Sequence, residues 1–206
     1  MMDYLHLYKP ENDNNCIKVF NVIDSFLEDK NAPVVLSAAK LFYAFINHLS
    51  SAPTGILRDF MFKISPQITR FLKGHSNQDF QHSVMIFLSG LSDEAFEQLT
   101  PLMNQFYFKP KDNINSKKLK AQILFRFCEL KLKSGVVGDN NEKKENNAGA
   151  IIDYLLSQLQ YQTYIRDDLV SHVCQAAFLC KQKSGEDFRY ILILFQIGGE
   201  SDKTSK

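Results

Sequence analysis

The sequence predicts an all-α protein in which neighbouring helices pack in pairs, and three observations lead to this fold class. Apolar residues recur every three or four positions along most of the chain, which is the spacing of one side of a helix. The 206 residues include 17 Phe and 8 Tyr but only 9 Gly and 6 Pro, a composition that suits helices better than a turn-rich β-protein. Segment 31–49 is apolar on nearly every side, so we expect it to lie between several other helices.

Segment 31–49 (NAPVVLSAAKLFYAFINHL) predicts an inner helix. Pro33 suits the first helical turn, where its missing N–H is not needed, and Asn31 can cap that turn from outside. At 3.6 residues per turn the polar positions fall on one narrow stripe, formed by Ser37, Lys40, Ala44 and His48. The remaining sides of this helix require cover from its neighbours.

The same periodicity predicts further helices before and after the inner one. They are expected at 16–27, 54–73, 78–91, 93–107, 114–133, 150–159, 164–183 and 188–197. Pro66 should break or kink the second of these, and a tight turn should join 16–27 to the inner helix as an antiparallel pair. In 114–133 apolar residues extend around much of the helix, which again indicates packing on two sides.

The spacing of the helices predicts a repeat. Second helices of successive pairs begin near residues 32, 78, 114 and 164, with steps of about 46, 36 and 50 residues. The last step contains 134–147 (SGVVGDNNEKKENN), whose glycines, asparagines and charges predict a mobile insert. Repeats of this size are typical of an α-solenoid of stacked HEAT/armadillo-like helical hairpins. We therefore expect a frayed N-terminus over 1–14, a solenoid segment over 15–198 and a polar tail over 199–206.

The net charge and the lengths of the apolar stretches indicate where the protein is expected in the cell. The 24 Lys and Arg nearly balance 23 Asp and Glu, so no overall field recruits nucleic acid or an anionic membrane. The N-terminal residues do not follow a signal-peptide pattern, and the longest apolar run, 190–195, is far too short to span a bilayer. We expect a cytoplasmic protein.

Structural roles explain the cysteines and His172 better than catalysis or metal binding does. Cys16, Cys128, Cys174 and Cys180 form no CxxC pair, and buried thiols in a reducing compartment are the expected interpretation. On one helix His172 and Cys174 would point about 200° apart, so they cannot share an ion with Cys180. We expect no catalytic residue, metal or cofactor, and no enzyme activity.

A basic cluster is the main surface feature that the sequence predicts. Its members are Lys109, Lys111, Lys117, Lys118 and Lys120, with Asp112 among them. The cluster could contact an anionic membrane surface or an acidic partner. The alternative is a solvated turn and helix edge without a binding role. Nucleic-acid binding is not expected, because the chain is nearly neutral and has no known motif of that kind.

Two stretches of the sequence resemble a known family. The run 32–42, APVVLSAAKLF, is similar to the VV(L/M)xxxKLF helix in the trunk of the β-class large subunits of adaptor-protein coat complexes, the β-adaptins. The run 104–124, NQFYFKPKDNINSKKLKAQIL, resembles the same family's aromatic residues, polar turn and KKLKxxIL helix. A weaker third likeness covers 151–179, and together the three span most of 16–197.

This resemblance implies a non-catalytic scaffold in vesicle-mediated protein transport. It implies binding to the medium, small and second large adaptor subunits, and indirect association with coated-vesicle, Golgi or endosomal membranes, with no nucleic acid and no small-molecule substrate. Residues implied to maintain the stack are Val34, Leu36, Leu41, Phe42, Leu119 and Leu124. Because the chain is much shorter than a β subunit, we expect a fragment or a reduced paralogue. The helix pattern also fits a generic HEAT-repeat protein-binding scaffold in nuclear import or in phosphatase or kinase assemblies.

Overall fold

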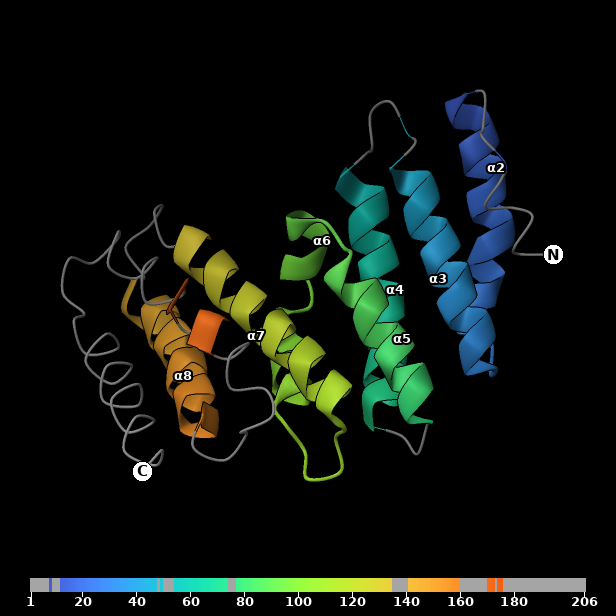
Figure 1. Ribbon diagram of the computed structural model, residues 1–206. Helices are drawn as coiled ribbons and strands as arrows, with labels where there is room; N and C mark the ends of the chain where they lie inside the picture. The colour runs from blue at the N-terminus through green and yellow to red at the C-terminus, as the bar shows by residue number, and fades with distance from the viewer. Residues whose placement is uncertain are drawn as a thin grey trace, which may run out of the picture. The chain divides into compact units, whose positions relative to one another are not determined.

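The computed structural model contains helices joined by short connections (Figure 1). It describes residues 8, 12–47, 49, 54–73, 77–134, 141–159, 170–172 and 174–175. Within these residues every regular element is a helix and none is a strand, which confirms the all-α class. The chain divides into two compact units, Met1–Gln105 and Phe106–Lys206, and each is considered by itself.

The first unit is a row of helices in which α3 has neighbours on several sides (Figure 1). Its elements are α2 (Asp13–Asp24), the 3₁₀ helix η1 (Ser25–Glu28), α3 (Ala32–Ile46), α4 (Thr54–Lys73), α5 (Gln78–Ser89) and α6 (Asp93–Glu97). Helix α3 packs against α2, η1, α4 and α5, while α4 also packs against α5 and α6. The predicted inner position of α3 is therefore confirmed within this unit.

Burial along α3 follows the predicted pattern. The buried residues are Val35, Leu36, Ala38, Ala39, Leu41, Phe42, Phe45 and Ile46. Ser37, Lys40 and Ala44 are half-buried, as expected for a narrow polar stripe. Pro33 lies in the first turn, but the Asn31 side chain does not cap the helix as predicted. Instead the Asn31 backbone N–H donates to Asp29 Oδ1 at 2.7 Å, so the preceding turn fixes this end.

Aromatic rings connect three successive helices of this unit. The ring centroids of Phe20 on α2 and Phe42 on α3 lie 4.5 Å apart, and those of Phe42 and Phe60 on α4 lie 4.9 Å apart. Tyr43 contacts Phe60 and, edge to face, Phe87 on α5. Such contacts add to the free energy gained from burying the rings themselves. The packed rings therefore hold α2, α3 and α4 in register.

Helix α4 continues through Pro66, so of the two predicted effects, a break or a kink, the break does not occur. Pro66 removes the N–H that would bond to the Phe62 carbonyl, but both residues lie on the exposed side of the helix, where water can reach that carbonyl. Next to Pro66 in the sequence, the Ser65 hydroxyl donates to Met61 O, and the Thr69 hydroxyl, one turn further on, donates to Ser65 O. The buried side of α4 keeps its apolar packing.

The predicted helix at 93–107 is divided in the structure. Helix α6 covers Asp93–Glu97 and a 3₁₀ helix, η2, follows at Thr100–Phe106. Pro101 lacks the backbone N–H that an α-helical continuation would require, whereas the start of a new helical turn tolerates it. Ala95, Phe96 and Leu99 are fully buried, so packing is retained across the division.

The second unit contains α7 (Ile114–Ser134) and α8 (Asn141–Leu159), which pack against each other. Ile123, Leu124 and Phe127 of α7 are buried, as are Ile151 and Leu155 of α8. Helix α8 begins at Asn141, before the predicted start at residue 150 and within the predicted insert 134–147. Glu and Lys are good helix formers, and this propensity outweighed the asparagines on which the prediction relied.

Several predictions concern residues outside those described. They are the N-terminal residues 1–7 and 9–11, the insert residues 135–140, the helix at 188–197 and the tail at 199–206. Of the predicted helix 164–183, residues 170–172 and 174–175 are described and are helical. In the described part of the chain, helices do not reach the length and apolar character needed to cross a membrane.

The aromatic packing gives a test with an internal control, because Phe60 and Phe62 lie in the same helix. Phe60 is 1% exposed and Phe62 is 82% exposed. We expect Phe60→Ala to lower the free energy of unfolding by about 3–5 kcal/mol, since it leaves a cavity between α3 and α4. Phe62→Ala should change it by less than about 0.5 kcal/mol. Urea unfolding followed by far-UV circular dichroism measures both, and equal losses would contradict this packing.

Candidate functional site

The five predicted lysines occur where the chain enters α7, but they do not form one surface. Lys109 and Lys111 are exposed in the turn before the helix, and Lys117 and Lys118 are half-buried in its first turns. Lys120 is only 4% exposed. Four of the five lysines therefore remain candidates for an external contact.

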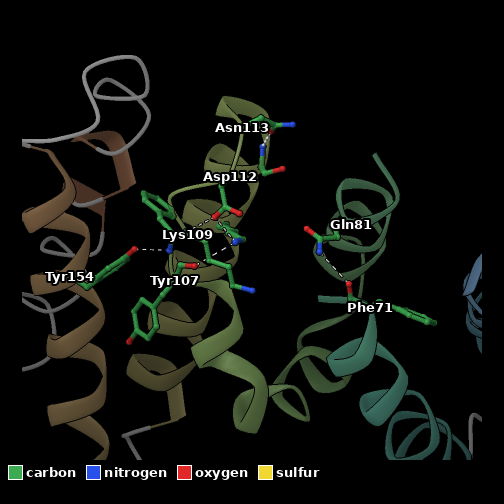
Figure 2. A network of polar contacts seen from close by, with 10 residues as sticks. Phe71, Gln81, Tyr107, Lys109, Asp112, Asn113 and Tyr154 are labelled. Atoms are coloured by element: carbon green, nitrogen blue, oxygen red, sulfur yellow. Dashed lines mark hydrogen bonds and ion pairs between the residues drawn. The ribbon is translucent and has the colours of Figure 1, made fainter. Parts of the chain in front are cut away.

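The buried lysine forms an ion pair inside the second unit. Lys120 Nζ lies 2.5 Å from Asp112 Oδ2, and the two side chains are 5% and 9% exposed. The same Asp112 oxygen accepts a hydrogen bond from the Lys109 backbone N–H at 2.6 Å. Lys120 Nζ also lies 3.5 Å from the Tyr107 carbonyl oxygen. The carboxylate thus connects the turn to α7, and Figure 2 shows Tyr107, Lys109 and Asp112 around this contact.

The prediction that Lys120 belongs to an external basic cluster is wrong because of its position on α7. Ser116, one turn earlier, is 5% exposed, and Leu124, one turn later, is fully buried. Spacings of four residues place all three on the same side of a helix. This spacing was the signal that could have revealed the burial of Lys120, and the density of lysines in the sequence obscured it.

Burial and the ion pair shift the pKa of Lys120 in opposite directions. Burial lowers the pKa of the Lys120 ammonium group below its usual 10.5, while the hydrogen bond and charge of Asp112 raise it again. Lys109 adds a weaker repulsion that lowers the pKa further. Lys120 is therefore a desolvated cation that the Asp112 carboxylate stabilises.

A tyrosine on α8 holds the same turn from the other side. The Tyr154 hydroxyl oxygen accepts a hydrogen bond from the Phe108 backbone N–H at 2.7 Å (Figure 2). The Tyr154 ring meets the rings of Tyr107 and Phe108 edge to face, with centroids 4.4 and 5.7 Å away. Burial raises the pKa of both Tyr107 and Tyr154 above 10.0. We call Asp112, Lys120 and Tyr154, with the 107–109 backbone, the Asp112 clasp.

The start of α7 is capped but carries no acidic residue. Asn113 Oδ1 accepts a hydrogen bond from the Ser116 backbone N–H at 2.7 Å, which satisfies one of the unpaired donors of the first turn. The first turn has no Asp or Glu. Lys117 and Lys118 instead lie close to the positive end of the helix dipole, an arrangement that an approaching anion would stabilise. The clasp fixes the turn, and Lys109, Lys111, Lys117 and Lys118, which we call the outer lysines, are the candidate groups for recognition.

The cysteines and His172 do not form a metal site in the described part of the chain. No group of three or more His, Cys, Asp or Glu residues that could hold a metal ion occurs there. Cys16 and Cys128 are buried and form no disulfide, as predicted, whereas Cys174 is exposed. The His172 ring stacks on Phe125 of α7 with centroids 5.2 Å apart, and a residue two positions further points the opposite way. Cys180 lies outside the described residues.

Comparison of the chain with models of known protein families and with curated proteins found no match.

The Asp112 clasp predicts a large stability effect at one aspartate. Asp112→Ala leaves the Lys120 cation buried without its carboxylate, so the free energy of unfolding should fall by about 3–5 kcal/mol. Asp153→Ala is the matched control, because Asp153 is an exposed aspartate on α8 in the same unit, and it should change the value by less than about 0.5 kcal/mol. Chemical denaturation at neutral pH measures both, and a small effect of Asp112→Ala would contradict a buried ion pair.

The hydrogen bond and burial of Tyr154 predict that the wild type and Tyr154→Phe differ in stability, and that the difference depends on pH. The variant leaves the Phe108 N–H without its acceptor, which should cost about 1–3 kcal/mol below pH 10. Burial raises the pKa of folded Tyr154, so ionisation of the buried phenol destabilises the folded wild type as pH rises above 10.0 through the folded pKa, even though the phenolate can still accept from Phe108. The stability gap between the two proteins should therefore narrow at alkaline pH. Urea titrations from pH 7 to 11 measure the gap, and a constant gap would contradict the burial of Tyr154.

Proposed function

We propose that the chain is a non-catalytic scaffold, a segment of a β-adaptin-like trunk that binds other subunits of a vesicle-coat adaptor complex. The observation that carries the proposal is the position of α3. The run 32–42, which resembles the β-adaptin trunk, lies on this helix, and α3 packs against α2, α4 and α5. A solenoid of stacked hairpins requires an inner helix covered in this way.

The second resembling run supports the same proposal through its local structure. In 104–124 the aromatic residues come first, then a turn, then α7. Phe106 is fully buried, with its ring centroid 5.8 Å from that of Phe127 on α7. Tyr107 contacts Tyr154 on α8. Each part of the run thus has a packing role that a trunk hairpin would need.

The outer lysines are the candidate contact of this scaffold with its partners. Lys109 and Lys111 are exposed just before α7, and Lys117 and Lys118 are half-buried at its start. These lysines suit an acidic loop of another subunit or an anionic lipid headgroup. In the proposed role the protein is cytoplasmic and reaches coated-vesicle, Golgi or endosomal membranes through its complex.

A generic HEAT-type protein-binding scaffold is the second candidate. The same paired helices and covered α3 would serve a scaffold in nuclear import or in a phosphatase or kinase assembly. The two candidates differ in their partners, because the first requires the medium, small and second large adaptor subunits.

Co-expression tests the adaptor proposal. The full chain, carrying an affinity tag, is expressed with the medium, small and second large adaptor subunits, and we expect a stoichiometric complex on size-exclusion chromatography. The tag expressed alone with the same three subunits is the control for non-specific recovery.

Far-UV circular dichroism establishes that the tagged chain is helical in the same preparations. Recovery of a folded chain without adaptor subunits would contradict the adaptor role. Stoichiometric recovery of import cargoes or of phosphatase or kinase subunits from cells would favour the second candidate.

A further inference from the structure

The outward side of α4 carries an unusually exposed aromatic residue. Phe62 is 82% exposed, whereas the other exposed large hydrophobic residues of the described chain lie between 42% and 57%. Phe62 has exposed neighbours one helical turn away on each side, Arg58 and Pro66. Packing within the first unit does not account for its exposure, because the core side of α4 is formed by Phe60, Met61 and Ile64.

Basic residues surround Phe62 along the helix. Arg58, Arg70 and Lys73 are exposed, and the acidic residue among them is Asp59. Spacings of four and eleven residues place Arg58, Pro66 and Lys73 on the same side as Phe62, with Asp59 and Arg70 at one edge of that side. We call this set, together with Phe62, the α4 face. Three positive charges against one negative charge make its field positive.

Neighbouring contacts hold the α4 face in place. Lys63, next to Phe62, forms an ion pair with Asp24 of α2 at 2.6 Å. The Arg70 guanidinium carbon lies 5.2 Å from the centroid of the buried Phe71 ring, an arrangement typical of a cation–π contact. A side chain that is already ordered loses less conformational entropy on binding. The face is therefore partly preorganised.

The proline adds a hydrogen-bond acceptor to this surface. Pro66 has no N–H, so the Phe62 carbonyl lacks its usual helical donor. The Ser65 and Thr69 hydroxyls, by contrast, donate to carbonyls of α4 itself. An exposed ring, a carbonyl that can accept a hydrogen bond and flanking cations thus occur together on one side of the helix.

From these observations we infer that the α4 face is a docking surface for a protein segment in which an apolar side chain is flanked by Asp or Glu. Its positive field complements such a segment, and aromatic residues and Arg are enriched at protein interfaces. A membrane is a poorer occupant, because the broad apolar side of α4 is already buried in the first unit and leaves one ring and a proline to enter lipid. This inference does not depend on membership of an adaptor complex.

Synthetic peptides test the inference on the full chain. The probes are fluorescein-labelled 12-residue peptides with a central Leu-Phe pair flanked by Asp and Glu, by Lys, or by Ser, and binding is measured by fluorescence polarisation. We expect the acidic-flanked peptide to bind at least tenfold more tightly than the other two, with an affinity that falls as salt concentration rises.

Three variants assign the binding to the α4 face. Phe62→Ala should weaken binding of the acidic-flanked peptide by about tenfold or more. The double variant Arg58→Glu and Lys73→Glu should reverse the preference toward the Lys-flanked peptide. Ile86→Ala, at an exposed position on α5, is the matched control and should bind as the wild type does. Thermal unfolding of each variant verifies that the fold is retained.

Either of two results would overturn the inference. One is acidic-flanked peptides binding no better than the other two, and the other is Phe62→Ala binding as tightly as the wild type. Vesicles of phosphatidylcholine with 30 mol% phosphatidylserine form the second arm. Phe62-dependent flotation with those vesicles, without peptide binding, would assign the face to a membrane and refute a protein partner.

Discussion

Burial of α3 is the constraint on which the first unit depends. A helix with eight buried residues among its fifteen cannot be stabilised by one neighbour, because one neighbour covers only one side. Helices α2, α4 and α5 therefore have to pack around it, and the rings of Phe20, Phe42 and Phe60 join α2, α3 and α4. Each of these three neighbours must therefore present an apolar side toward α3.

The sequence predicted this part of the fold well because the determining signal is local. The spacing of apolar residues placed α2, α3, α4 and α5 within a few residues of their observed bounds, and the inner position of α3 followed from its composition. Boundaries at 97 and 141 were predicted less well. There the outcome depends on competition between proline geometry, helix propensity and packing against distant residues, which periodicity does not measure.

The candidate site shows the same distinction between local signals, which the sequence reveals, and contacts with distant residues, which it does not. Charge density predicted a cluster of five lysines, and the structure places four of them in exposed or half-buried positions. The fifth, Lys120, could not be separated from the others by charge alone, because its burial depends on Asp112 and on packing in the second unit. Tyr154 was not predicted at all, since its contact with Phe108 joins residues that are distant in the sequence.

The Asp112 clasp is better explained by conformational specificity than by net stability. Moving two charges out of water costs free energy that their attraction only partly returns, so an apolar pair could fill the same space at similar or lower cost. An apolar pair, however, would not distinguish one arrangement of the turn from another. Asp112 accepts from Lys120 and from the Lys109 backbone at once, and these two directional bonds restrict the path of the turn. A fixed turn also sets the positions of the Lys109 and Lys111 side chains on the surface. A recognition surface requires side chains that are held in defined positions.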